Sequence, residues 1–321
     1  MSEPAKTLSP DFQEAFAKDR PELLRHCYRM MGAFADAEEQ VQEVLLNAWR
    51  FRSTFEGEVP VAHWLMRIAT NTCLKELARR KARGLPQLDR SPAAVGTPFE
   101  QLEASNWVTP APDSQLFLTP EEAIGAREDV AIAFIALLQR LPPKQRAVLL
   151  LKDVVGWSSE EIASALDLTV SSVSNALHRA REGVARRPRG RVEDPPPEVL
   201  KEYIRSWETR DVDGLVALLK KDVVFAMPPH ATWFCGADAV RQFLLTPRFA
   251  AFWARGLKAT PTRANGLPAL VWYWPAADRD PRPHSVHVMR FEGGLLAEAI
   301  NFIGGHYLSG FGAAQEGTPT R

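Results

Sequence analysis

The sequence predicts a multidomain protein in which two all-α helical modules, the second with a helix-turn-helix, precede an α+β module. Three observations predict this fold class. Residues 12–83 and 120–187 carry apolar side chains at helical spacing with few breaking residues. Segments rich in proline and glycine follow each of these stretches. Beyond residue 198, short apolar runs such as VVFAMP and LPALVWYWP are typical of β-strands.

These changes of composition define the expected domain boundaries. We expect a first helical module over 8–84, a linker over 85–127, a second helical module over 128–187, a short linker over 188–197 and the α+β module over 198–313. The first linker is acidic and rich in Pro, Gly and Ser, which is typical of a soluble tether or of a segment ordered by a partner.

Composition narrows the class of protein. The chain has 321 residues, 45% of them hydrophobic, which is ordinary for a globular protein. Basic and acidic residues number 39 each, so any contact with nucleic acid depends on local charge clusters. The absence of a long apolar run and of a signal-peptide layout predicts a cytoplasmic protein with no membrane partner. Three widely spaced cysteines without paired Cys/His ligands nearby predict neither a disulfide framework nor a metal site, and no cofactor is expected.

The stretch DAEEQVQEVLLNAW in the first module predicts an amphipathic helix. Its expected apolar face contains Val41, Val44, Leu45, Ala48 and Trp49. The acidic side chains lie opposite, and for a single helix the simplest interpretation of such a face is contact with solvent.

A basic helix with aromatic neighbours follows. The run VAHWLMRIATNTCLKELARRKAR carries Arg67, Lys75 and Arg79, and Phe55 and Trp64 are close in sequence. Cations bind phosphates and aromatic rings stack on unpaired bases, so this combination suits a single nucleic-acid strand. Taken alone, the apolar neighbours of Trp64 favour core packing instead.

The second module contains the pattern of two helices joined by a tight turn. Ser158 or Ser159 is the expected N-cap of the first helix, and Thr169 can cap the second. The second helix is expected to expose short polar groups at its start and basic groups later, namely Ser171, Ser172, Asn175, His178 and Arg179. Such a face suits a DNA major groove, although three-helix packing in proteins that bind no DNA produces the same spacing.

The first module resembles region 2 of bacterial RNA polymerase sigma factors of the extracytoplasmic-function group. The resemblance covers CYRMMGAFADAEEQVQEVLLNAWRFRSTFEG and VAHWLMRIATNTCLKELARRKAR. It implies that the acidic helix binds core RNA polymerase, with Asp36, Glu39 and Gln42 facing it. It also implies that the basic helix reads and melts the minus-ten promoter element, with the side chains Arg67, Asn71, Lys75 and Arg79.

The second module, from LPPKQRAVLLL to HRARE, resembles region 4 of the same family. That resemblance implies binding of the minus-thirty-five element and docking on the polymerase flap. The partners expected from both matches are promoter DNA and the β and β′ subunits of core RNA polymerase. In the family the segment between the two regions runs through polymerase. The acidic composition of residues 85–127 fits that path, and it fits a soluble tether equally well.

The α+β module is similar to SnoaL-like domains of the NTF2 superfamily, in which a cone of curved sheet is closed by helices. The order of its elements and the closing text LLAEAINFIGGHYLSGFG carry this resemblance. Candidates to line a pocket for a small ligand are Tyr203, Trp207, Trp233, Trp272 and His287, although aromatic residues on strands more often fill a core. No acidic or histidine pair has a spacing that indicates catalysis, so no catalytic residue is assigned and a regulatory role is expected.

The leading hypothesis is therefore a transcription initiation factor without chemistry of its own. One alternative is a helix-turn-helix regulator that binds duplex DNA without polymerase. The other is a small-molecule-binding protein or isomerase-like enzyme centred on the C-terminal module.

Overall fold

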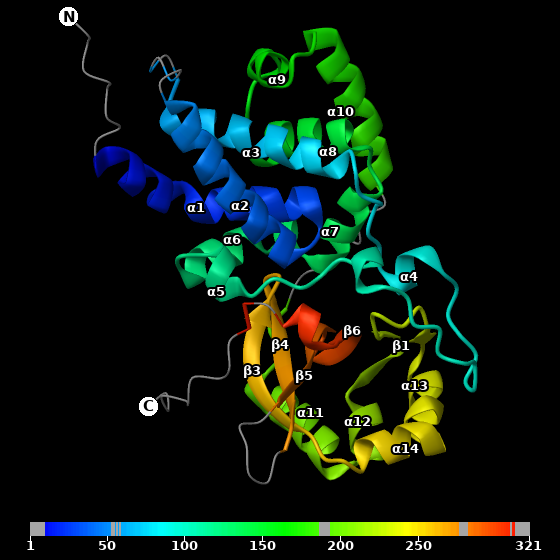
Figure 1. Ribbon diagram of the computed structural model, residues 1–321. Coiled ribbons are helices and arrows are strands. Elements are labelled where there is room, and N and C mark those ends of the chain that lie inside the picture. The colour runs from blue at the N-terminus through cyan, green and yellow to red at the C-terminus, as the bar shows by residue number, and fades with distance from the viewer. Residues whose placement is uncertain are drawn as a thin grey trace, which may run out of the picture. The chain divides into compact units, whose positions relative to one another are not determined.

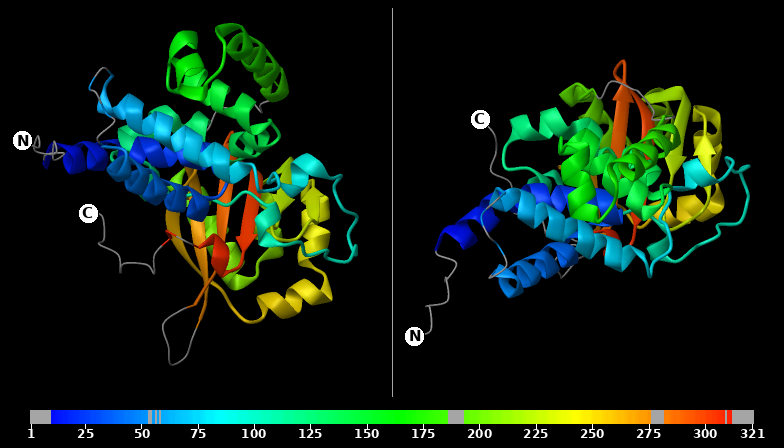
Figure 2. Two further views of the ribbon diagram at one scale, coloured as in Figure 1. Left: turned by 45° about the horizontal axis from the view of Figure 1, so that its top comes forward. Right: turned by 90° about the horizontal axis from the view of Figure 1, so that it is seen from above.

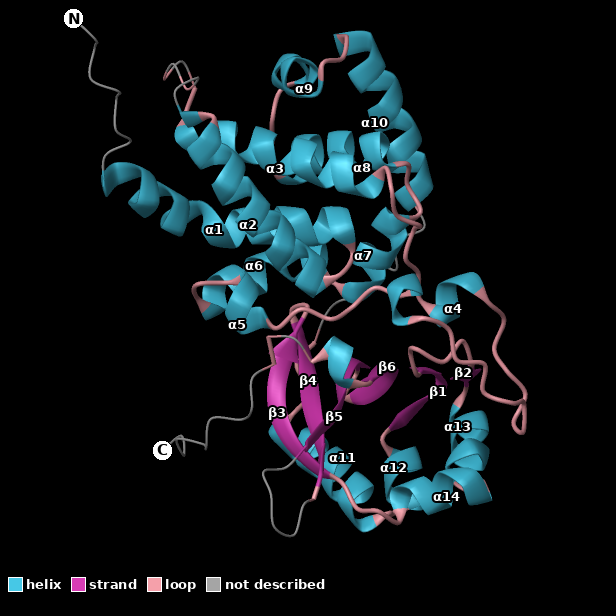
Figure 3. Ribbon diagram, viewed as in Figure 1, coloured by secondary structure: helices cyan, strands magenta, loops and turns pink. Residues whose placement is uncertain are grey.

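The computed structural model describes residues 10–52, 55, 57, 59–185, 193–275, 282–308 and 310–311. The chain forms two compact units. Unit 1 contains residues 1–83, 115–120 and 133–187, and unit 2 contains residues 84–114, 121–132 and 188–321. Figure 1 labels the elements and Figure 3 distinguishes helices from strands. No helix in the described part of the chain has the length and apolar character needed to cross a membrane.

The helices of the first 187 residues follow the expected pattern. They are α1 (Pro10–Met31), α2 (Phe34–Arg50), α3 (Val61–Leu77), α4 (Pro86–Asp89), α5 (Asp113–Leu116), α6 (Pro120–Val130), α7 (Ile132–Gln139), α8 (Pro143–Leu149), α9 (Ser159–Leu166) and α10 (Val170–Val184). A 3-10 turn covers Ala104–Asn106, and a π-helical turn, Leu150–Val154, continues α8.

In unit 1, α1, α2 and α3 pack together around buried side chains such as Leu24, Tyr28, Val44 and Leu65. The two views of Figure 2 show these helices crossing one another in blue and cyan. Of the five apolar residues expected on one face of α2, Val41, Val44 and Ala48 are buried, whereas Leu45 is 38% exposed and Trp49 is 50% exposed. The core therefore covers a narrow stripe of α2, and Leu45 and Trp49 lie outside that stripe.

Local signals define the helix-turn-helix. Ser158 caps α9 by accepting a hydrogen bond from the backbone N–H of Glu161 (3.1 Å), and the Glu161 carboxylate accepts from the backbone N–H of Ser158 (2.7 Å). Asp167 ends α9 in the left-handed conformation with φ 54°. Thr169 Oγ1 then accepts from the backbone N–H of Ser172 (3.1 Å) and caps α10. Both the turn and the Thr169 cap are confirmed.

Unit 2 is built around one mixed sheet. Its later helices are α11 (Pro197–Thr209), α12 (Val212–Ala217), α13 (Ala237–Leu244) and α14 (Pro247–Trp253), and a 3-10 turn covers Gly305–Tyr307. Its strands are β1 (Leu219–Ala226), β2 (Trp233–Cys235), β3 (Lys258–Ala264), β4 (Leu267–Trp274), β5 (Arg282–Glu292) and β6 (Leu295–Ile303). The strand order is β2-β1-β6-β5-β4-β3, with β1 and β6 parallel and the other pairs antiparallel.

The sequence analysis missed β2 and β3, the two edge strands of this sheet. β2 has only three residues. The sequence of β3, KATPTRA, contains a proline and polar residues, so its β-strand signal is weak. The helices and the concave side of the sheet enclose an aromatic core that includes Trp207, Phe225 and Trp272.

Residues 84–114 pack against the rest of unit 2 and touch both edge strands of its sheet. At the β2 edge, the backbone N–H of Ala93 donates to the Trp233 carbonyl (2.8 Å), and Trp233 Nε1 donates to the Arg90 carbonyl (3.0 Å). Near the β3 edge, the backbone N–H of Asn265 donates to the Ala111 carbonyl (3.0 Å). We name this segment, residues 84–114, the belt.

Most of the expected linker is therefore ordered by the C-terminal module of the same chain. Besides the belt, residues 121–132 also belong to unit 2. The expected boundaries at residues 8, 187 and 313, and residues 188–192 of the second linker, lie outside the described residues.

His26 gives unit 1 a testable dependence on pH. The ring is fully buried, and its Nε2 lies 2.9 Å from Thr70 Oγ1. Burial, aided by the charge of Arg29, lowers the pKa of His26 to about 4. Between that pH and about 6.5, the usual pKa of histidine in an unfolded chain, the unfolded state binds a proton that the native state excludes. The free energy of unfolding should therefore fall as the pH falls through this window.

We expect His26→Gln to reduce this loss by about 2 kcal/mol between pH 7 and pH 4.5, measured by urea unfolding of the full chain. Glutamine removes the titrating ring but can still bond Thr70. The matched control is His178→Gln, because the side chain of His178 is 76% exposed. An unchanged pH dependence in His26→Gln would contradict the assignment.

Candidate polymerase- and DNA-binding surfaces

Three of the residues predicted to contact the minus-ten element lie on one face of α3, and the fourth, Arg79, lies in the turn just after it. Arg67, Asn71, Lys75 and Arg79 are all exposed, and they follow one another at intervals of four residues, which places them along one stripe. The opposite face of α3 is buried through Leu65, among others. The stripe therefore exists because burial of the other face fixes the rotation of the helix.

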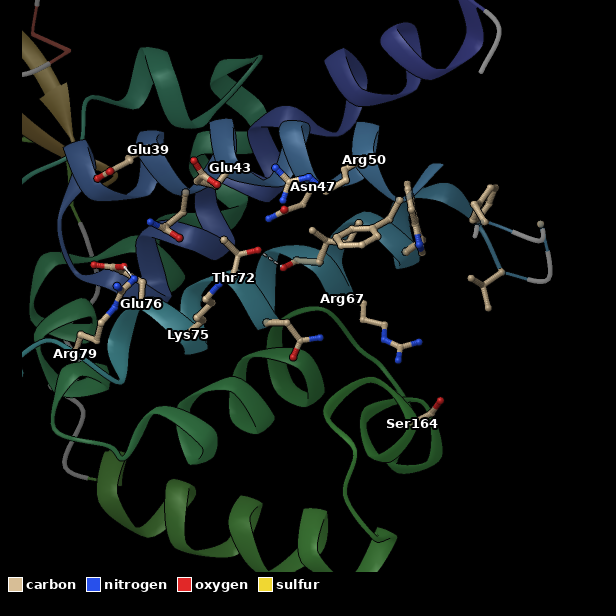
Figure 4. Close-up of a pocket in the computed structure, with 18 residues that line it drawn as sticks. Glu39, Glu43, Asn47, Arg50, Arg67, Thr72, Lys75, Glu76, Arg79 and Ser164 are labelled. Atoms are coloured by element: carbon tan, nitrogen blue, oxygen red, sulfur yellow. Dashed lines mark hydrogen bonds and ion pairs between the residues drawn. The ribbon is translucent and has the colours of Figure 1, made fainter. Parts of the chain in front are cut away.

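This stripe forms one wall of a groove of about 1000 Å³. Figure 4 shows Arg67 and Lys75 projecting from α3, whereas Glu43, Asn47 and Arg50 project from α2. One end of the groove is aromatic, because the rings of Phe55 and Trp64 lie 5.1 Å apart. Trp64 is neither fully buried in the core nor fully exposed.

Such a groove has the chemical parts that a single nucleic-acid strand requires. Cationic side chains along one wall can bind successive phosphates. An aromatic end can accept an unstacked base, and amides such as those of Asn47 and Asn71 can bond base edges.

The three residues predicted to face polymerase differ in their surroundings. Glu39 and Gln42 are exposed on α2. Asp36 instead accepts from Arg80 and from Arg83, the latter at 2.5 Å. Its side chain is only 18% exposed, so it ties the start of α2 to the segment that follows α3.

Glu76 completes this ion-pair cluster. Its carboxylate lies 2.6 Å from Arg80 Nε. The hydrogen bond from Arg80 lowers the pKa of Glu76, against a smaller opposing effect of burial. Carboxylates of unit 1 hold Arg80 and Arg83, and Arg79 Nη2 also donates to Glu76 Oε2 (2.9 Å). Exposed cations that line the groove are Arg50, Arg67, Lys75 and Arg79.

The five residues predicted to read the minus-thirty-five element are all exposed on α10, namely Ser171, Ser172, Asn175, His178 and Arg179. The opposite face is buried through Val173 and Ala180. Arg181 has a structural role, since it binds both carboxylate oxygens of Asp153 at 3.0 and 2.6 Å.

The C-terminal cone encloses a cavity of about 40 Å³, enough for roughly three water molecules. Of the five predicted pocket residues, Trp207 and His287 line it. Tyr203 and Trp272 lie in the surrounding core, with ring centroids 6.2 and 5.7 Å from that of Trp207. Trp233 does not line this cavity, because its indole faces the belt.

Sequence reasoning missed several polar groups of this cavity. Asn301 and Ser285 line it, and Asn301 is directly opposite His287 in the β5–β6 pairing. Trp207 Nε1, His287 Nδ1 and Asn301 Oδ1 are buried and find no hydrogen-bond partner within the described chain. Burial lowers the pKa of His284 to about 4 and that of His287 well below its usual value, so both rings are neutral at pH 7.

Comparison with known proteins matches each part of the chain to a family model. Residues 15–83 match Sigma-70 region 2, residues 131–182 match Sigma-70 region 4 and residues 200–299 match the SnoaL-like domain. These matches coincide with the groove of α2 and α3, with the helix-turn-helix and with the cone.

Two relatives and one solved structure extend the comparison. The ECF RNA polymerase sigma factor SigG of Mycobacterium tuberculosis is 38% identical over 311 residues, which cover 94% of this chain and 83% of SigG. SigJ of the same organism is 29% identical over 238 residues, 70% of each chain. The crystal structure of SigJ aligns with a TM-score of 0.58 at 22% identity, over 92% of this chain and 98% of SigJ, and therefore shares the fold. From the identity with SigG and its coverage, we conclude that the chain belongs to the extracytoplasmic-function RNA polymerase sigma factors.

Proposed function

We propose that this protein binds core RNA polymerase through the β and β′ subunits, recognises promoter DNA and promotes its melting. The observation that carries the proposal is the single exposed stripe of Arg67, Asn71, Lys75 and Arg79 along a groove with an aromatic end. A duplex-binding regulator has no need of such a strand-binding groove. The exposed polar face of α10 is then assigned to the minus-thirty-five element.

The exposed apolar side chains of α2 support a polymerase contact. Leu46 is 57% exposed and Trp49 is 50% exposed, beside Glu39 and Gln42 on the same helix. Large apolar side chains exposed together are typical of a protein interface. We assign Leu46 and Trp49, together with Glu39 and Gln42, to the contact with core polymerase. We assign Asp36 to the internal ion-pair cluster.

For the C-terminal module we propose regulation through the belt rather than catalysis. The belt is held at Asn265, whose Oδ1 accepts from the backbone N–H of Ala111 (3.0 Å) and whose Nδ2 donates to the Val130 carbonyl (2.7 Å). Because these bonds restrain the segment between regions 2 and 4, the module can control how freely that segment moves. A small ligand bound in the cone would provide a second means of regulation. The three unpaired polar atoms around the cavity could bond such a ligand.

The stripe is tested with polymerase holoenzyme. We expect Arg67→Ala/Lys75→Ala to weaken binding to a probe with a single-stranded minus-ten element and to reduce the salt dependence (log Kd against log salt) by about 1.4, because each phosphate contact to a single strand contributes about 0.7. The control is Lys201→Ala/Lys221→Ala, which removes two exposed lysines of unit 2. The same loss in both variants would contradict a role for the stripe.

The different roles of Asp36 and Glu39 are separable. Asp36→Asn should lower the free energy of unfolding by about 1–2 kcal/mol, because two arginines lose a charged partner. Glu39→Gln should leave the free energy of unfolding within about 0.5 kcal/mol and weaken binding to core polymerase. Urea unfolding and fluorescence anisotropy with labelled protein measure the two effects. If Asp36→Asn instead weakened polymerase binding and Glu39→Gln lowered the free energy of unfolding, Asp36 would be assigned to the polymerase interface.

The belt is tested with Asn265→Gly, because Asn265 has φ 56° and glycine preserves that backbone while deleting the side chain. Loss of its hydrogen bonds should raise the amide exchange rate of Ala111 about tenfold and change the yield of run-off transcripts. Arg210→Gly, at φ 62° and away from the belt, is the matched control. Faster exchange with no change in transcription would contradict regulation through the belt.

A further inference from the structure

The cavity of the cone has a mouth that α14 helps to form. Most side chains that line the cavity are buried, but Phe249 and Phe252 of α14 are half-buried, as are His284 and Ile303. The ring of Phe252 lies 5.3 Å from that of His284 on β5. The present space of about 40 Å³ holds roughly three water molecules, whereas a benzene ring needs about 150 Å³. Because buried side chains are closely packed, a ring-sized molecule can enter only if the half-buried side chains at the mouth move.

The polar atoms around the cavity indicate the chemistry of a ligand. Trp207 Nε1 can only donate a hydrogen bond and Asn301 Oδ1 can only accept one, and both are buried without a partner in the described chain. His287 Nδ1 takes either role according to its tautomer. Among the described residues that line the cavity, none is a lysine, arginine, aspartate or glutamate. The cavity therefore suits an uncharged molecule with an apolar body and a hydroxyl group, which both donates and accepts.

Helix α14 also contacts the belt. Arg248, which precedes Phe249 on α14, places its guanidinium carbon 4.8 Å from the centre of the Phe99 ring in the belt. The Phe99 ring lies 5.9 Å from that of Phe243 on α13, which in turn lies 4.7 Å from the ring of Phe249. Figures 1 and 2 show the belt passing beside α13. The same short helix therefore lines the cavity through its phenylalanines and holds the belt through Arg248.

The loop between β1 and β2 brings the belt close to the cavity as well. Met227 at the start of this loop lines the cavity. Two residues later, the Pro229 carbonyl accepts from the backbone N–H of Leu102 in the belt (3.0 Å), and the ring of His230 lies 5.2 Å from that of Phe99. The Leu102 amide is therefore a local measure of how firmly the belt is held beside the cavity.

We propose that the cone binds a small uncharged molecule that carries a hydroxyl group, and that its entry moves α14 away from Phe99 and loosens the belt. Trp253 anchors the C-terminal end of α14, since its Nε1 donates to the Trp207 carbonyl (2.6 Å). The movement therefore falls on the N-terminal half of the helix, which carries Arg248 and Phe249. This inference rests on the proposed regulation through the belt, and it adds the class of ligand and the route by which the ligand acts.

Binding is tested on the full chain with benzyl alcohol, with toluene and benzoate as matched compounds. The three share a ring and differ in the hydroxyl group and the charge. We expect benzyl alcohol to shift the NMR signal of the Trp207 indole N–H in a saturable way, and benzoate to bind at least about tenfold more weakly, because the site cannot compensate a buried charge.

The polar contact is tested with Asn301→Leu, which keeps the size of the side chain and removes the acceptor. It should weaken binding of benzyl alcohol about fivefold, as the loss of one buried hydrogen bond predicts. Toluene needs no polar partner, so its unchanged binding would show that the variant keeps its cavity. An equal loss of affinity for both compounds would contradict the role of Asn301.

The coupling to the belt is measured by amide exchange at Leu102. Saturation with benzyl alcohol should raise the exchange rate about threefold, the effect of losing one exposed cation–π contact. Arg248→Gln should raise the rate to the same extent without any ligand, and benzyl alcohol should then add little. Arg255→Gln is the matched control, because Arg255 is also exposed and its guanidinium carbon lies 4.0 Å from the ring centre of Trp274, outside the belt. This variant should respond to benzyl alcohol as the unmodified protein does.

These readouts involve neither polymerase nor DNA, so they separate the inference from the proposed function. No binding of benzyl alcohol, or equal binding of benzoate, would overturn the ligand site and leave water as the content of the cavity. Binding without a change at Leu102, or the same response in Arg248→Gln as in Arg255→Gln, would overturn the coupling through α14. Control of transcription by the belt is judged separately, by the run-off assay on Asn265→Gly.

Discussion

An open β-sheet has two edge strands whose outer backbone groups need partners, and in this protein the belt supplies some of them. It bonds to Trp233 on β2 and to Asn265 just beyond β3. The side chains that pack there are apolar and buried, as Trp107 and Val108 show at 4% and 0% exposure. The cone and the segment between regions 2 and 4 therefore fold together, and each depends on the other for burial and hydrogen bonding.

This dependence also fixes the path of the segment between regions 2 and 4. In a free tether, the 31 residues of the belt would sample many conformations. Bonds such as that between Asp113 Oδ1 and the backbone N–H of Gly266 (2.8 Å) replace this freedom with a defined path. Burial raises the pKa of Asp113, although the Gly266 bond and the charge of Arg263 partly oppose this effect.

Electrostatic pairing sorts the charged residues of unit 1 into two groups. Arg80, Arg83 and Arg181 are held by carboxylates at part-buried or surface positions and position helices. Arg67, Lys75 and Arg179 point outward from α3 and α10 and are available for phosphates. In sequence these two groups look alike, since both consist of basic residues on helices a few positions apart.

The sequence by itself determined the fold class, the helix-turn-helix with its Ser158 and Thr169 caps, and the exposed face of α10, because these depend on periodicity and on bonds between residues close along the chain. Tertiary structure alone decided the ion pairs of Asp36, the exposure of Leu45 and Trp49, the exclusion of Trp233 from the cavity and the path of the belt. Each of these depends on a partner far away in sequence, such as Arg83 for Asp36 or Arg90 for Trp233. The composition of a segment indicates whether it is polar or apolar, but it does not predict which distant backbone groups will form hydrogen bonds with that segment.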